Sequence, residues 1–92
     1  MKETTIVLEK NLIVSYLEEI EKKVKDEIGK KIDQLTIDFS KSAVVDSSGI
    51  GLLVKIHNTL KKTNGTLKIV GLQDDVKKML MMMNLNRHFE IE

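Results

Sequence analysis

The stretch that decides the fold lies near the middle of the chain and reads Val44-Val45-Asp46-Ser47-Ser48-Gly49-Ile50-Gly51-Leu52-Leu53. Residues 35–39 precede it and show the apolar alternation of a buried strand. An acid and two hydroxyls then stand directly before apolar residues at helical spacing. The stretch therefore predicts a corner at which a strand ends and a helix begins.

Two features of this corner bear on function. Asp46, Ser47 and Ser48 can cap the helix, because a short side-chain oxygen accepts from the unpaired N–H groups of the first turn. Capping is the more common role for such residues. Gly49 and Gly51, however, each lower helix propensity by about 1 kcal/mol relative to Ala. Two glycines in the first turn favour a surface that leaves room for something to approach.

The corner also carries a family resemblance. It is preceded by Leu35-Thr36-Ile37-Asp38-Phe39 and followed by Gly65-Thr66-Leu67-Lys68-Ile69-Val70-Gly71. Together these segments resemble the STAS domain of bacterial anti-sigma factor antagonists, and the likeness extends over residues 5–90. The resemblance implies an α/β domain with a mixed, largely parallel sheet of about four strands and helices packed against it.

The resemblance further implies a phosphorylation switch. Ser47, the serine directly after the aspartate, is expected to be phosphorylated by an anti-sigma factor serine kinase, and Ser48 is the fallback position. Unmodified, the domain would bind that kinase and release a sigma factor, and a protein phosphatase would reverse the modification. The expected phosphosite and partner environment comprises Asp38, Asp46, Ser48, Gly49, Gly51, Leu52 and Ile56. No catalytic residue, cofactor or metal ligand is expected.

The chain differs from the family pattern in two places. Residues 9–13, Glu9-Lys10-Asn11-Leu12-Ile13, stand where the family has a glycine-containing turn with an acid. An N-terminal strand and a terminal helix of longer relatives are also missing. These differences affect how a partner would be recognised more than they affect the fold.

Length and composition exclude several classes of protein. The chain has 92 residues, which suits a single domain spanning residues 1–92, and 15 basic against 14 acidic residues give a formal charge of +1. Neither this charge nor the three aromatic residues favour nucleic-acid binding. There is no cysteine to form a disulfide or thiolate metal site. No segment has the length of a signal peptide or membrane span, so we expect a cytoplasmic protein without membrane contact.

Hydrophobic spacing predicts alternating strands and helices. Strands are expected at residues 4–8, 35–39 and 66–70, with a short one within 87–92. Helices are expected from Ile13 to a stop at Gly29, over residues 48–62, and from about Asp74 onward. The apolar residues of the second helix span more than one stripe. We assign Ile50, Leu53, Val54 and Leu60 to the core, and Leu52 and Ile56 to a partner contact. In the third helix we assign Met79 and Met83 to the core and leave Met81 and Met82 open.

Asp38 falls at the carboxyl end of the second strand, close to the Ser47 corner. Its ordinary role would be a hydrogen bond to the following loop through Ser40 or Ser42. Alternatively, Asp38 and Asp46 form an acidic pocket that orients the Ser47 hydroxyl or attracts the magnesium of a kinase-bound nucleotide. His57 has no companion cluster and is predicted to be a boundary histidine.

Enzymatic readings fit poorly. A serine hydrolase elbow requires Gly two residues before the nucleophile, and Val45 or Asp46 stands there instead. Neither a G-x-G-x-x-G nor a phosphate-loop motif is present. Two other readings stay open. One is a module that senses a small anion or nucleotide at the helix start near Ser47. The other is a scaffold subunit of a signalling assembly.

Overall fold

The sheet consists of four strands, β1 (Glu3–Val7), β2 (Gln34–Asp38), β3 (Thr66–Val70) and β4 (Glu90–Ile91), in that order across the sheet. A computed structural model describes all of residues 1–92. All three neighbouring pairs are parallel, with Ile6 opposite Ile37 and Ile37 opposite Ile69. The α/β class and the number of strands predicted from the sequence are confirmed, and the sheet contains no antiparallel pair.

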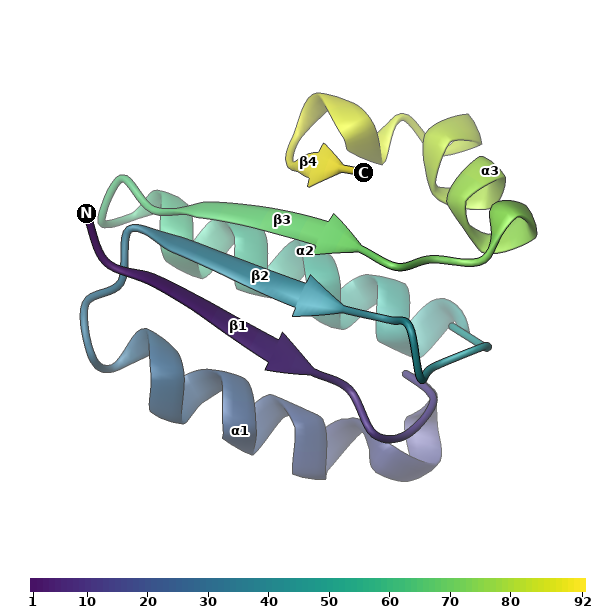
Figure 1. Ribbon diagram of the computed structural model, residues 1–92, viewed down its shortest axis with the longest axis horizontal. Coiled ribbons are helices and arrows are strands. Elements are labelled where there is room, and N and C mark those ends of the chain that lie inside the picture. The colour runs from purple at the N-terminus through teal and green to yellow at the C-terminus, as the bar shows by residue number, and fades with distance from the viewer.

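Parallel neighbours need a crossover, and helices supply it. The helices are α1 (Leu17–Ile28), α2 (Ser47–Lys61) and α3 (Asp74–Met82), with short 3-10 turns η1 (Val14–Tyr16) and η2 (Leu85–Arg87). Because the strand order advances in one direction, right-handed crossovers place α1 and α2 on the same face of the sheet, as Figure 1 shows. Helix α3 lies beyond the carboxyl end of β3, and the chain then returns to form β4 (Figure 1).

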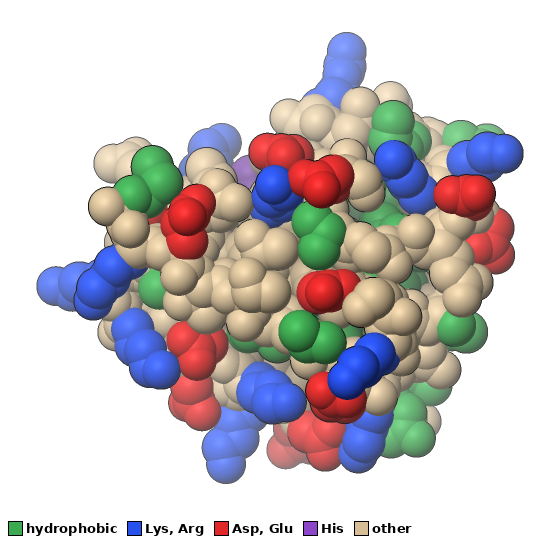
Figure 2. Space-filling view, viewed as in Figure 1, with side chains coloured by type: hydrophobic (Ala, Val, Ile, Leu, Met, Phe, Trp, Pro, Cys, Tyr) green, Lys and Arg blue, Asp and Glu red, His purple; other side chains and the backbone are tan.

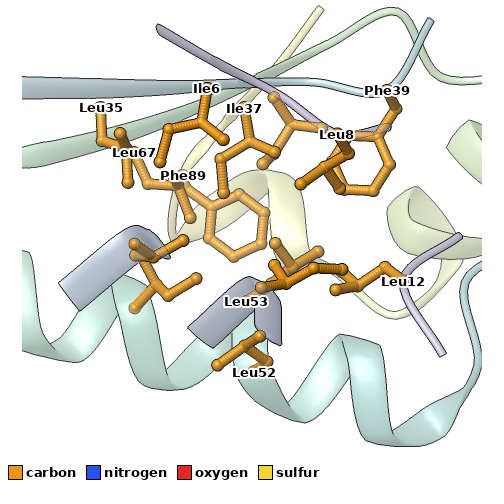
Figure 3. Close-up of a cluster of buried hydrophobic side chains, with 14 of the residues drawn as sticks. Ile6, Leu8, Leu12, Leu35, Ile37, Phe39, Leu52, Leu53, Leu67 and Phe89 are labelled. Carbon is orange, nitrogen blue, oxygen red and sulfur yellow. The ribbon is translucent and has the colours of Figure 1, made fainter. Parts of the chain in front are cut away.

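The core fills the space between the sheet and the two helices. The inward-facing side chains of the strands alternate along the sequence, and those of β2 and β3 are at most 1% exposed. Figure 3 shows them pointing toward α2, with the ring of Phe89 from the C-terminal segment among them. The most deeply buried large side chains are Phe39, Leu12, Leu35, Ile37, Leu53, Leu60, Leu67, Ile69, Leu80 and Val24.

The opposite face of the sheet carries no helix. All-parallel sheets are usually covered on both faces, and an uncovered face needs polar side chains. Thr36 and Lys68 point to this side, and Lys68 forms ion pairs with Glu90 at 3.5 Å and Glu92 at 2.8 Å. Figure 2 views this face and shows apolar side chains scattered among charged and polar ones. The open face is therefore compatible with water.

The structure corrects the core assignments made from the helix patterns. Leu52 and Ile56 are buried, at 5% and 4% exposure, because they lie between α2 and α1. Ile50 and Val54 are only partly buried. Met79 packs against the core as expected, but Met83 is 49% exposed, so its assignment to the core was wrong. Met81 and Met82, left open above, are both exposed.

None of the three helices has both the length and the apolar character needed to cross a bilayer.

Helix α1 begins later than predicted, because residues 14–16 form the 3-10 turn instead of continuing as α-helix. Its C-terminus at Gly29 agrees with the sequence.

Candidate functional site

The segment that leads into α2 is hydrogen-bonded to the loop that follows β1. We call residues 11–14 and 43–51 together the Ser47 corner. The side-chain oxygen of Asn11 accepts hydrogen bonds from the backbone amides of Ala43 at 2.8 Å and Val44 at 3.1 Å. Leu12 forms a parallel bridge with Val45, through bonds from its own N–H to Val44 and from the Asp46 N–H to its carbonyl. These contacts hold the two segments of the corner together.

Asp46 joins the two parts of the corner with one carboxylate. Its Oδ1 accepts from the backbone N–H of Gly49 at 2.8 Å, which makes it the N-cap of α2. Its Oδ2 accepts from the backbone N–H of Val14 at 2.9 Å. The Gly49 bond first, and then the Val14 bond, lower the pKa of this carboxyl. Asp46 is therefore an anion at neutral pH, and both its oxygens are engaged.

Ser47 is the first residue of α2 and is exposed. Because Asp46 supplies the cap, the hydroxyls of Ser47 and Ser48 are not needed for that role. Neither hydroxyl makes a hydrogen bond within the chain, and Ser48 is the less exposed of the two. Of the three residues that could cap the helix, only Asp46 does so. The Ser47 hydroxyl is exposed and has no hydrogen-bond partner within the chain.

The two glycines of the corner have different reasons to be glycine. A Cβ on Gly49 would lie 2.2 Å from the carbonyl oxygen of Leu12, so the close approach of the loop after β1 requires a residue without a side chain. A Cβ on Gly51 would meet nothing within 4 Å. Gly51 is exposed and lies four residues, or about one helical turn, after Ser47. The fold itself does not require glycine at this position.

Asp38 serves the loop after β2. Its Oδ1 accepts from the backbone N–H of Ser40 at 2.8 Å, which confirms the ordinary role predicted for it. Gly71, at φ +76°, closes over this loop, and a Cβ there would lie 2.6 Å from the same carboxylate oxygen. No hydrogen bond joins Asp38 to Asp46 or Ser47. Each carboxylate binds backbone amides, and the acidic pocket that the sequence offers as an alternative role for Asp38 stays a prediction.

The apolar surface beside Ser47 differs from the one predicted. Leu52 and Ile56 are not exposed; they line a groove of about 220 Å³ between α1 and α2. The exposed apolar side chains of the corner are Val14 at 66% and Val44 at 49%. Both belong to segments that hydrogen-bond to the Asp46 or Asn11 side chain. The sequence does not predict these positions, since only the pairing of the two loops brings Val14 to Asp46.

A shallow hollow of about 210 Å³ continues this surface toward α3. It lies on the Val44 side of the corner and offers space for a side chain of a binding partner. The lining residues are Ala43, Val44, Val45, Asp75, Val76 and Met79.

The chemistry available at the corner is limited. No group of three or more His, Cys, Asp or Glu side chains is placed to hold a metal ion. No histidine hydrogen-bonds to Ser47, and His57 lies about 15 Å further along α2 at 1.5 Å per residue. The arrangement offers an accessible hydroxyl on Ser47 and an adjacent carboxylate on Asp46. It also offers the exposed side chains of Val14 and Val44, which we call the apolar rim. Such a surface suits modification and protein binding.

Known proteins share the fold described above. A family model for the STAS domain matches residues 3–92. A Thermotoga maritima protein, TM1081, described as a candidate anti-sigma factor antagonist, has a crystal structure that superposes with a TM-score of 0.83 at 24% identity, covering 95% of this chain and 77% of that one. The NMR structure of TM1081 superposes with a TM-score of 0.80 at 24% identity, and the match covers 96% of this chain and 71% of that one.

The anti-sigma factor antagonist SpoIIAA, in its unphosphorylated form, superposes with a TM-score of 0.76 at 20% identity, covering 100% of this chain and 81% of SpoIIAA. At these identities the superpositions show a common fold. No curated protein matches the sequence. Since the family model matches from residue 3 to residue 92, the chain belongs to the STAS domain family.

Proposed function

We propose that this protein is a cytoplasmic anti-sigma factor antagonist, a binding module without catalytic activity that is switched by phosphorylation of Ser47. Residues 1–92 act as one domain. Unmodified, the Ser47 corner binds an anti-sigma factor serine kinase and thereby frees a sigma factor. Phosphorylation by that kinase ends the interaction, and a protein phosphatase restores it. The fold similarity to TM1081 and SpoIIAA, both described as anti-sigma factor antagonists, supports this assignment.

The observation that carries the proposal is the state of the Ser47 hydroxyl. It is exposed at the first residue of α2, on a backbone held by Asp46, Asn11 and Leu12. A kinase needs a hydroxyl that it can reach and orient in line with the γ-phosphate. Because Asp46 already caps the helix, transfer of the Ser47 proton and attachment of phosphate break no bond of the fold.

The switch is electrostatic and local. A phosphoserine adds about −1.5 to −2 charges at neutral pH. At position 47 that charge stands beside the Asp46 carboxylate, whose oxygens already occupy the nearby amides of Gly49 and Val14. In the free domain, water solvates the phosphate. In a complex the phosphate would be desolvated next to an anion, which costs several kcal/mol when no cation pairs with it. Since 1.4 kcal/mol is tenfold in affinity, this is enough to dissociate the partner.

The apolar rim supplies the attraction in the unmodified state. Val14 and Val44 are exposed on the two segments of the corner, and the hollow beside Val44 can receive a partner side chain. Gly51 leaves the surface open one turn further along α2. A partner can therefore approach the helix backbone closely and bury the two valines.

The alternative of an anion sensor at the start of α2 has less support. Helix N-termini bind anions through free N–H groups. Here the Asp46 carboxylate takes the Gly49 N–H and places its own negative charge at that position. A scaffold function has no observation of this structure in its favour.

Calorimetric titration of the domain with the anti-sigma kinase of its source organism tests the proposal. Ser47→Asp should bind at least tenfold more weakly than the unmodified domain and should fail to displace the sigma factor. Asn58→Asp, which places the same charge at an exposed position of the same helix, should bind within twofold of the unmodified domain. Equal affinities for Ser47→Asp and the unmodified domain would show the switch to be wrong.

A further inference from the structure

A second concave site lies away from the Ser47 corner. It is a cleft of about 560 Å³ near the amino ends of β2 and β3, closed on one side by α2 and on another by the segment that leads into β4. Its volume lies within the range of small-molecule sites. The lining residues are Gln34, His57, Gly65, Thr66, Leu67, Lys68, Asn86, Arg87, His88, Phe89 and Glu90.

The cleft lining has more cationic than acidic side chains, and one of its cations forms no ion pair. Glu90 is the only acid in the lining, and it pairs with Lys68 at 3.5 Å. Lys68 pairs with Glu92 as well, at 2.8 Å. Arg87 forms no ion pair or side-chain hydrogen bond within the chain, so its guanidinium donors are free. The lining thus contains one unneutralised cation, and the side-chain amide of Asn86 contributes a further donor.

Two histidines meet in the same cleft. The ring centroids of His57 and His88 are 5.8 Å apart, and His57 is equally far from Phe89. The Nδ1 atom of His57 is buried and has no hydrogen-bond partner. Burial first, and then the charges of His88 and Lys61, lower the pKa of His57. No carboxylate is among the groups that act on His57, and the one acid of the cleft lining, Glu90, is already engaged by Lys68.

We propose that this cleft binds a small oxyanion, one that carries phosphate or carboxylate groups. Arg87 presents a planar fork of donors that matches either group in bidentate geometry. The anion supplies the opposite charge that the His57 imidazole lacks, so His57 takes up a proton as it binds. The charged groups around His57 are Lys61, His88, Arg87, Lys68 and Glu90, and together they favour a negative ligand. This site is separate from Ser47 and does not depend on the phosphorylation switch.

The test uses inorganic pyrophosphate and citrate as probes, at matched ionic strength, with the intact domain. Calorimetry should show saturable binding of at least one probe, stronger at pH 6 than at pH 7.5. The probe that binds more tightly identifies phosphate or carboxylate as the preferred group. Amide chemical-shift changes should centre on residues 65–68 and 86–90, and the imidazole pKa of His57 should rise in the complex.

Variants locate the site. Arg87→Gln should weaken binding at least tenfold, whereas Lys78→Gln, which removes the same charge from an exposed position on α3, should change it less than twofold. The proposal is overturned if neither probe binds saturably, if the two variants lose affinity equally, or if the shift changes centre on residues 47–51.

Discussion

The backbone N–H of Val14 donates a hydrogen bond to Oδ2 of Asp46 at 2.9 Å, across 32 positions of sequence. The other oxygen of the same carboxylate caps α2 through Gly49. One side chain therefore sets the position of the loop after β1 and the start of the helix. The surface around Ser47 has its shape because Asp46 makes both bonds.

Replacing Asp46 separates these two bonds. Asp46→Asn keeps an acceptor for the Gly49 N–H, since Asn is as good a cap as Asp, but it cannot accept two bonds through two oxygens. Asp46→Ala loses both. Urea denaturation should therefore rank stability as wild type, then Asp46→Asn, then Asp46→Ala. Equal midpoints for the two variants would mean that the Gly49 cap contributes nothing.

The two glycines should respond to Ala in opposite directions. Gly49→Ala forces the Leu12 carbonyl away from the helix. Such overpacking of a close contact lowers the free energy of unfolding by about 1–3 kcal/mol or more. Gly51→Ala enters open space and should gain up to about 1 kcal/mol from helix propensity. Chemical unfolding of both variants checks this. A destabilised Gly51→Ala would show that the exposed position is not as open as the structure has it.

Most of the fold could be predicted from the sequence because its signals are local. Leu35, Ile37 and Phe39 alternate with polar residues, and Gly29 stops α1 where the apolar spacing ends. The predicted strand at residues 66–70 agrees with the observed one. Such patterns depend only on neighbours in sequence.

The details of the site could not be predicted, because they depend on pairing between distant segments. Nothing in the residues after β1 shows that Asn11 and Leu12 bind the backbone of residues 43–46. The pattern of α2 covers more than one stripe, so it does not tell which residues face α1. The sequence therefore predicts Leu52 and Ile56 on the surface, although α1 covers them.

The apolar rim should matter for binding and little for folding. Val44→Ser and Val14→Ser remove exposed side chains, so stability should stay within about 0.5 kcal/mol of wild type. Affinity for the anti-sigma kinase should fall at least tenfold for Val44→Ser. Met82→Ser, a still more exposed apolar position at the end of α3, serves as the control and should bind normally. If only Met82→Ser weakened binding, the partner surface would lie on α3 instead.

Acid should destabilise the domain through His57. Its pKa is lowered in the folded state from 6.5, so the unfolded chain takes up the proton first as the pH falls. The contribution of neutral His57 is complete above pH 6.5 and is lost as the pH falls through 6.5 toward the folded-state pKa. Thermal unfolding between pH 7.5 and 5.5 should show a falling midpoint, with a shallower fall in His57→Gln. Identical slopes would contradict this role.

Phosphotransfer is the most direct test of the central claim. The domain is incubated with magnesium-ATP and each anti-sigma kinase of its source organism, and the modified residue is mapped by mass spectrometry in wild type, Ser47→Ala and Ser48→Ala. We predict a single phosphate on Ser47, lost in Ser47→Ala and retained in Ser48→Ala. A folded domain that no kinase modifies, or a phosphate that remains in Ser47→Ala, would contradict the account and leave the exposed hydroxyl without the role proposed for it.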